Sequence, residues 1–133
     1  MDSRWIRNSV LIGLAPLILV ILLVHPGERR DAAEAGLQAA QDSHLLDEDV
    51  GPNLHIGLMI VGWVHTEADS GTAELLIPVS GSRGRGRLYA REQRDRYGWH
   101  VCSLDFRGYK RRAFGYYRGP LKPIVSDQNC TAD

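Results

Sequence analysis

Two side chains that can bind metals, His100 and Cys102, lie two positions apart in a segment that predicts a β-strand. Successive side chains of a strand alternate between its faces, so we expect both on the same face. With His55 or His65 as a third ligand, such a set would suit a soft metal, copper above all. The alternative is structural, with Cys102 as a small buried residue and His100 on the sheet surface. The sequence favours this alternative, because it has no Cys-x-x-Cys-His haem attachment signal and no Met cluster. We therefore expect no metal and no cofactor.

Cys102 and Cys130 are the two cysteines of the chain. They can form one disulfide if the protein faces an oxidising compartment. The sequence does not show whether they meet, so one disulfide and two separate thiols both stay open at this point, with the separate thiols favoured.

A glycine-rich segment also deserves a chemical interpretation. Gly81, Gly84 and Gly86 alternate with Arg83 and Arg85, which is a composition that can cradle an anion. A phosphate loop would need a following helix and a Lys-Ser/Thr pair, yet here the next residues alternate as a strand does. The segment therefore predicts a basic hairpin tip. The acidic residues 47–49 are expected to form a solvated loop. No Ser-His-Asp or Cys-His spacing in the sequence indicates an enzyme.

These residues must be positioned by a short series of elements. Asp31 can cap a weakly amphipathic helix over residues 32–41, and residues 47–53 contain a Gly-Pro breaker. Strands are expected over residues 54–61, buried on both faces, and then over 72–79, 87–93 and 99–106, with a possible last strand at 113–117. In the second strand Ala73, Leu75, Ile77 and Val79 share one face. Pro78 lacks a donor, so it should lie at an edge or a bulge.

This order predicts an α+β fold in which one amphipathic helix packs on an antiparallel β meander of about four to five strands. We expect an N-terminal transmembrane helix before it. The expected domains are a membrane anchor at residues 1–27, the α+β domain at 28–118 and an irregular C-terminal tail at 119–133.

The anchor is predicted from residues 10–24, which contain twelve Leu, Ile or Val residues. At roughly −0.3 to −0.6 kcal/mol each, these residues favour insertion into a bilayer. Fifteen residues are too short to cross, so the span should extend over residues 5–25 with Trp5 at the headgroups. A cleaved signal peptide is the alternative, but no small-x-small cleavage site closely follows the apolar run. The net positive N-terminal flank favours an N-terminus inside and a domain outside.

Charge is divided unevenly along the chain. Residues 28–82 carry ten acidic and two basic side chains, whereas residues 83–133 carry twelve basic and five acidic ones. Such polarity can be satisfied within the fold, or it can offer a basic face to a membrane or an acidic partner. We favour the first and expect no nucleic-acid binding, because no nucleic-acid motif accompanies the arginines.

Residues 71–90, GTAELLIPVSGSRGRGRLYA, followed by Gly98, Trp99 and Leu104, resemble the cytochrome c oxidase assembly factor family. This family is similar to the intermembrane-space domain of a presequence-translocase subunit of the mitochondrial inner membrane. The resemblance covers residues 32–106. Its shared positions Pro78, Gly81, Gly84, Gly86 and Trp99 have structural explanations as turns, an edge and a core.

The resemblance implies a membrane-anchored, non-enzymatic assembly or accessory factor of a respiratory-chain complex. It would lie in the cytoplasmic or mitochondrial inner membrane, with its C-terminal domain in the periplasm or intermembrane space, and would contact an integral membrane complex. Candidate partner-binding residues are Gly13 and Pro16 of the anchor and Arg83, Arg85 and Arg87 of the hairpin. The alternatives are a metal- or ligand-binding domain using His100 and Cys102, and a subunit of a protein-translocation machine.

Overall fold

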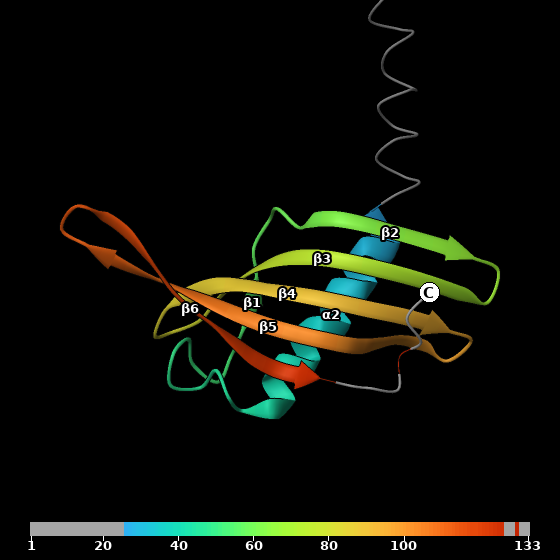
Figure 1. Cartoon of the computed structure of the whole chain (residues 1–133), viewed down its shortest axis with the longest axis horizontal. Helices are drawn as coiled ribbons and strands as arrows, with labels where there is room; N and C mark the ends of the chain where they lie inside the picture. Colours follow the sequence, from blue (N-terminus) through green and yellow to red (C-terminus); the bar gives the residue numbers. More distant parts are fainter. Residues whose placement is uncertain (1–25, 127–129, 131–133) are drawn as a thin grey trace, which may run out of the picture.

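A computed structural model describes residues 26–126 and Cys130. Helix α2 (Pro26–Ser43) comes first and lies across one face of an antiparallel sheet (Figure 1). The six strands are β1 (His55–Ile56), β2 (Val61–Glu67), β3 (Ser70–Ser80), β4 (Arg85–Asp95), β5 (Gly98–Arg112) and β6 (Gly115–Ser126). Their order is β1-β3-β4-β5-β6, with β2 also pairing with β3. The predicted α+β fold with a helix on an antiparallel sheet is confirmed, with six strands in place of four to five.

Helix α2 is longer than the sequence predicted. It already includes Pro26, so Asp31 lies within the helix and is not its N-cap. Proline is compatible with the first turn, where its missing N–H has no intrahelical partner to lose. Glu28 in the same turn has the sign that the helix dipole favours. It also accepts a hydrogen bond from the Thr66 hydroxyl, at 3.0 Å, which ties the start of the helix to β2.

The helix packs on the sheet through small residues. Ala33, Gly36 and Ala40 are buried and lie three and four positions apart, on one face of α2. A Cβ on Gly36 would lie 3.2 Å from Ile77 Cδ1, so the helix approaches the sheet closely. The expected face of β3 is confirmed, since its four alternate residues from Ala73 to Val79 are all buried beneath the helix.

The predicted strand over residues 54–61, buried on both faces, is wrong. Strand β1 stops at Ile56, and β2 begins at Val61 on the same edge of β3. Between them residues 57–60 stand opposite only residues 77–78. Gly57 donates its N–H to the Pro78 carbonyl at 2.8 Å, but proline has no N–H to donate in return. Pairing therefore breaks at Pro78, as expected of that residue, and Leu58 becomes fully exposed.

The predicted irregular tail from Gly119 is also wrong, because β6 runs as far as Ser126. Strand β6 is an edge strand of the sheet, and its pairing with β5 shifts register in two places. An edge strand with bulges tolerates Pro120 and Pro123, since an N–H that would point to solvent is not missed. Both prolines therefore lie within an edge strand, and the regular structure continues beyond them.

The β5–β6 hairpin is longer than its neighbours. The last residue pair between β4 and β5 joins Arg85 to Tyr109, but β5 and β6 continue to pair as far as Arg112 and Gly115. Residues 110–117, called the β5–β6 arm below, therefore extend beyond the sheet (Figure 1).

Within residues 26–126, no helix combines the length and the apolar character needed to cross a bilayer. The expected span, residues 5–25, lies outside the described residues, as do its candidate contact residues Gly13 and Pro16.

Candidate partner-binding surface

One face of the sheet, called the open face below, is not covered by any helix of the described residues. Strand register places Val61, Leu76 and Tyr89 side by side on this face, with Trp63 next along β2. Trp63 is 49% exposed, and Val61 and Tyr89 are exposed as well. These side chains border a shallow hollow of about 400 Å³. An exposed apolar and aromatic cluster of this kind is typical of a protein interface.

Arginines extend the open face toward the β5–β6 arm. Arg85 and Arg87 of β4 lie beside Arg107 and Tyr109 of β5. The guanidinium of Arg87 lies 5.3 Å from the Tyr109 ring centroid, and that of Arg107 lies 6.0 Å from the Tyr89 ring centroid. Stacking on aromatic rings holds these cations on the surface without removing their charge. The predicted contact residues Arg85 and Arg87 are thus brought together on the open face.

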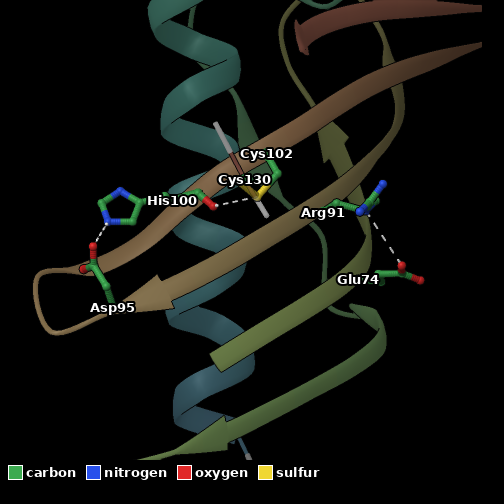
Figure 2. The surroundings of a disulfide bond; sticks show 6 residues. All are labelled: Glu74, Arg91, Asp95, His100, Cys102 and Cys130. Carbon is green, nitrogen blue, oxygen red and sulfur yellow. Dashed lines mark hydrogen bonds and ion pairs between the residues drawn. A yellow bond between two sulfur atoms is a disulfide. The ribbon is translucent and has the colours of Figure 1, made fainter. Parts of the chain in front are cut away.

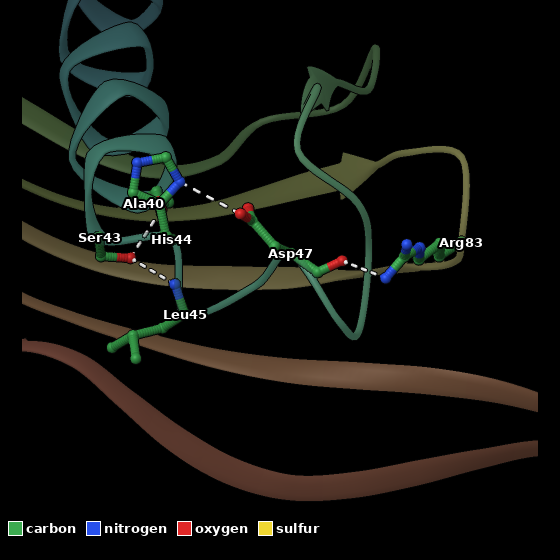
Figure 3. Close-up of polar contacts among 6 residues, drawn as sticks. All are labelled: Ala40, Ser43, His44, Leu45, Asp47 and Arg83. Carbon is green, nitrogen blue, oxygen red and sulfur yellow. Dashed lines mark hydrogen bonds and ion pairs between the residues drawn. The ribbon is translucent and has the colours of Figure 1, made fainter.

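Arg83, the third predicted contact residue, borders a hollow of about 690 Å³ together with Arg85 and Arg87, but it is bonded to the loop after α2. Its Nη1 donates to the Asp47 carbonyl at 3.3 Å, as Figure 3 shows. Its backbone N–H donates to the Val50 carbonyl at 2.9 Å. Arg83 therefore fastens the β3–β4 hairpin to the acidic loop after α2, which gives it a structural role.

The hairpin glycines are explained by the same loop. A Cβ on Gly84 would lie 2.6 Å from the Asp49 carbonyl oxygen, and one on Gly81 would collide with the Val50 carbonyl. Gly86, further along, leaves room for the Phe106 ring. Their place beside protein backbone, and the strand that follows, agree with the prediction of a hairpin. Trp99, the last of the shared motif residues, is partly buried against the core.

The predicted solvated acidic loop at residues 47–49 is confirmed, since Glu48 and Asp49 are exposed and Asp47 is half-buried. Figure 3 shows its junction with α2, where the Ser43 hydroxyl donates to the Ala40 carbonyl at 2.7 Å. Lys122 of β6 lies 3.5 Å from an Asp49 carboxylate oxygen and donates to the Leu45 carbonyl at 2.7 Å.

Ion pairs join the acidic and basic halves of the chain. Besides Asp49–Lys122, Glu28 lies 3.8 Å from Arg94, and Glu74 lies 3.9 Å from Arg91. Each pair takes its acid from residues 28–82 and its base from residues 83–133. Part of the uneven charge is therefore paired within the fold, as expected. Exposed ion pairs of this kind stabilise the fold only weakly.

His100 and Cys102 do not share a face, contrary to the prediction. The pairing of β4 with β5 shifts register at Arg91 and Glu92, which is a β-bulge. Val101 and Cys102 consequently both turn toward the core, and His100 stays exposed. Cys102 is bonded to Cys130 (Figure 2). A disulfide sulfur is not a thiolate ligand.

His100 is instead held by a surface turn. Its Nε2 lies 2.8 Å from Asp95 Oδ2, as Figure 2 shows. The Tyr97 N–H bonded to the Asp95 carboxylate, and then the neighbouring His100, lower the pKa of Asp95. The residues that the structure describes contain no cluster of three or more His, Cys, Asp or Glu side chains fit to hold a metal ion.

Sequence reasoning missed Glu92, the buried carboxyl of the core. It is 2% exposed, and neither carboxyl oxygen has a hydrogen-bond partner among the residues that the structure describes. Burial raises the pKa of Glu92 to about 8, so the group is mostly neutral at pH 7. The signal was the alternation of β4, in which Leu88 and Ala90 face the core and Glu92 follows two positions later.

No family model, no curated protein and no solved structure matches this chain. The resemblance to the cytochrome c oxidase assembly factors thus stays a prediction from the residues quoted above.

Proposed function

We propose that this chain is a membrane-anchored, non-enzymatic assembly or accessory factor of a respiratory-chain complex of the cytochrome oxidase type. It acts through protein contacts, and its docking surface is the open face of the sheet. The observation that carries this proposal is the exposure of Trp63, Val61 and Tyr89 beside ring-stacked arginines, on a face that no helix within residues 26–126 covers. Trp, Tyr and Arg are the side chains most enriched where proteins bind other proteins.

The disulfide supports the proposed compartment. Cys102 and Cys130 are joined across 28 positions of the chain. Structural disulfides persist in the periplasm and other oxidising spaces, and are rare where thiols are kept reduced. This fits a domain on the outer side of an inner membrane, in the periplasm or intermembrane space, with residues 5–25 in the bilayer. The bonded state of Cys102 speaks against the alternative of a metal site built on that residue.

The test is co-purification of the full chain from membranes in mild detergent, with identification of the subunits that accompany it. We expect subunits of a respiratory complex, and we expect Trp63→Ser and Arg87→Ala to reduce their yield. Tyr97→Ser is the matched control, because Tyr97 is an exposed aromatic residue in the β4–β5 turn, away from the open face. Equal yields from Trp63→Ser and Tyr97→Ser would contradict the proposed surface.

The anchor is tested by the same method. If Gly13 and Pro16 form a helix contact, Gly13→Leu should also reduce the yield, since small residues let helices approach in a bilayer. Recovery of translocation-machine subunits in place of respiratory subunits would select the alternative partner class and overturn the proposal.

A further inference from the structure

The β5–β6 arm extends beyond the strands that flank its base. Past the pair Arg85–Tyr109, β4 no longer pairs with β5, and the strand register of residues 110–117 joins the two strands of the arm to each other. A two-stranded ribbon is marginally stable by itself. An arm kept beyond the sheet therefore suggests that something else contacts it.

The arm and its base are strongly basic and aromatic. Residues 107–118, RGYKRRAFGYYR, contain five basic and four aromatic side chains, and residues 106–126 contain no acidic one. Phe114 stands at the turn with 104% relative exposure, so its ring contacts almost nothing. Lys110 and Arg118 are exposed on either side of it along the hairpin. The acidic loop lies at the base of this end, where the Asp49 backbone is close to Gly84 and the Asp49 carboxylate is 3.5 Å from Lys122.

A fully exposed phenyl ring in a segment rich in basic residues matches the chemistry of an anionic lipid surface. The ring gains by entering the boundary between headgroups and acyl chains, and Lys and Arg side chains remain at the phosphates. Each basic residue near such a surface adds to the attraction. We infer that the β5–β6 arm binds the surface of a bilayer rich in anionic phospholipid, with Phe114 inserted at the interface.

The placement of the arm fits this role. Figure 1 shows the arm projecting from the left end of the sheet, with its tip at about the height of the start of α2 in this view. A membrane surface next to the start of α2 could therefore also meet the tip of the arm. The inference rests on the membrane placement in the proposed function, and adds a second, lipid-selective contact that would orient the open face relative to the bilayer.

The experiment uses the full chain in nanodiscs of phosphatidylcholine alone, or of phosphatidylcholine mixed with phosphatidylglycerol. Amide hydrogen exchange is measured by mass spectrometry for peptides that cover the arm, and for the β4–β5 turn as an internal reference. Exchange in the arm is expected to slow several-fold in the anionic discs only, since docking stabilises a ribbon that otherwise opens readily. High salt should remove the slowing, because it screens surface charge.

Two variants and two matched controls separate the ring from the charge. Phe114→Ser and Lys110→Glu should both reduce the protection of the arm against exchange in anionic discs. For Lys110→Glu we expect a reduction of about fivefold or more, since one favourable charge is lost and one unfavourable charge is added. Tyr97→Ser and Arg96→Glu likewise remove an aromatic ring and reverse a positive charge, but at the β4–β5 turn, where Arg96 stacks on the exposed Tyr97 ring. These controls should leave exchange in the arm unchanged.

Three results would overturn the inference. They are equal exchange of the arm in both kinds of disc, an equal effect of Arg96→Glu and Lys110→Glu, and protection of the arm by an oligonucleotide but not by anionic lipid. Incorporation is checked first by co-elution of the chain with the discs. A chain that fails to co-elute refutes the membrane placement itself, whereas a co-eluting chain with an unprotected arm refutes only the role of the arm.

Discussion

Gly36 of α2 lies directly against the carboxyl group of Glu92 on β4, so that a Cβ at position 36 would come within 3.0 Å of Glu92 Oε1. The helix is thus docked on an ionisable group that has no hydrogen-bond partner in the described part of the chain. Burying a carboxylate without a partner is costly, and the group responds by keeping its proton. The contact between α2 and the sheet should therefore depend on the protonation of one side chain.

The first prediction concerns the pH dependence of stability. The pKa of Glu92 is about 8 in the folded protein, against 4.5 as its ordinary value. Between these two pH values the folded chain holds a proton that the unfolded chain has lost. The free energy of unfolding should therefore fall as pH rises from 4.5 to 8, by roughly 3–5 kcal/mol, and then level off.

Urea denaturation followed by circular dichroism across this pH range measures the effect. The Glu92→Gln variant, which cannot ionise at this position, should show a much flatter profile and should be more stable than the parent chain at pH 8. The same slope in both proteins would mean that another group titrates. Asp95 is no confounding group, because its lowered pKa places its contribution below this window.

The second prediction concerns the space beneath the helix. Gly36→Leu should cost about 1–3 kcal/mol, since the new side chain would push against Ile77 and Ala90 in a filled core. Gly27→Leu is the matched control, because a Cβ at that position meets nothing within 4 Å. In the control, a better helix former replaces glycine, so stability should be unchanged or rise by under about 1 kcal/mol. Urea midpoints of the two variants give the comparison, and equal losses would contradict close packing at Gly36.

How far the sequence predicts this structure depends on whether the information is local. Alternation along β3 was sufficient to place Ala73 and Val79 in the core, and the missing donor of Pro78 was sufficient to predict a break in pairing. Local patterns did not reveal that the bulge at Cys102 reverses the alternation, because a bulge depends on the partner strand. Pro120 likewise looked like the end of regular structure, since nothing local shows that β6 lies at an edge.

The candidate site was predictable only in part for the same reason. The arginines of the hairpin could be identified by composition, but their separation into an open-face pair and a loop contact depends on how the loop after α2 folds back. Trp63 was absent from the predicted sites because the register of β2 decides which face it occupies. Strand pairing, which is non-local, therefore defines the surface.

The third prediction concerns the disulfide between Cys102 and Cys130. Closing a loop of 28 positions restricts the unfolded chain. In the chain-entropy account this restriction stabilises the fold by roughly 3–4 kcal/mol. Reduction, or the double change Cys102→Ser with Cys130→Ser, should lower the free energy of unfolding by about this amount. Urea denaturation with and without reductant tests it, and the double variant should then be insensitive to reductant. A reductant effect that persists in the double variant would refute the assignment.

The last prediction separates two neighbouring arginines by role. Arg83 donates to the Asp47 carbonyl, whereas Arg87 stacks on Tyr109 on the open face. Arg83→Ala should therefore cost about 0.5–1.5 kcal/mol of stability, the usual worth of one hydrogen bond, and leave co-purification with the partner complex intact. Arg87→Ala should show the opposite pattern, with reduced co-purification and a stability change within about 0.5 kcal/mol. Both quantities are measured on both variants. If Arg83→Ala loses the partner complex while its stability is unchanged, Arg83 itself binds the partner. The binding surface would then be larger than the open face.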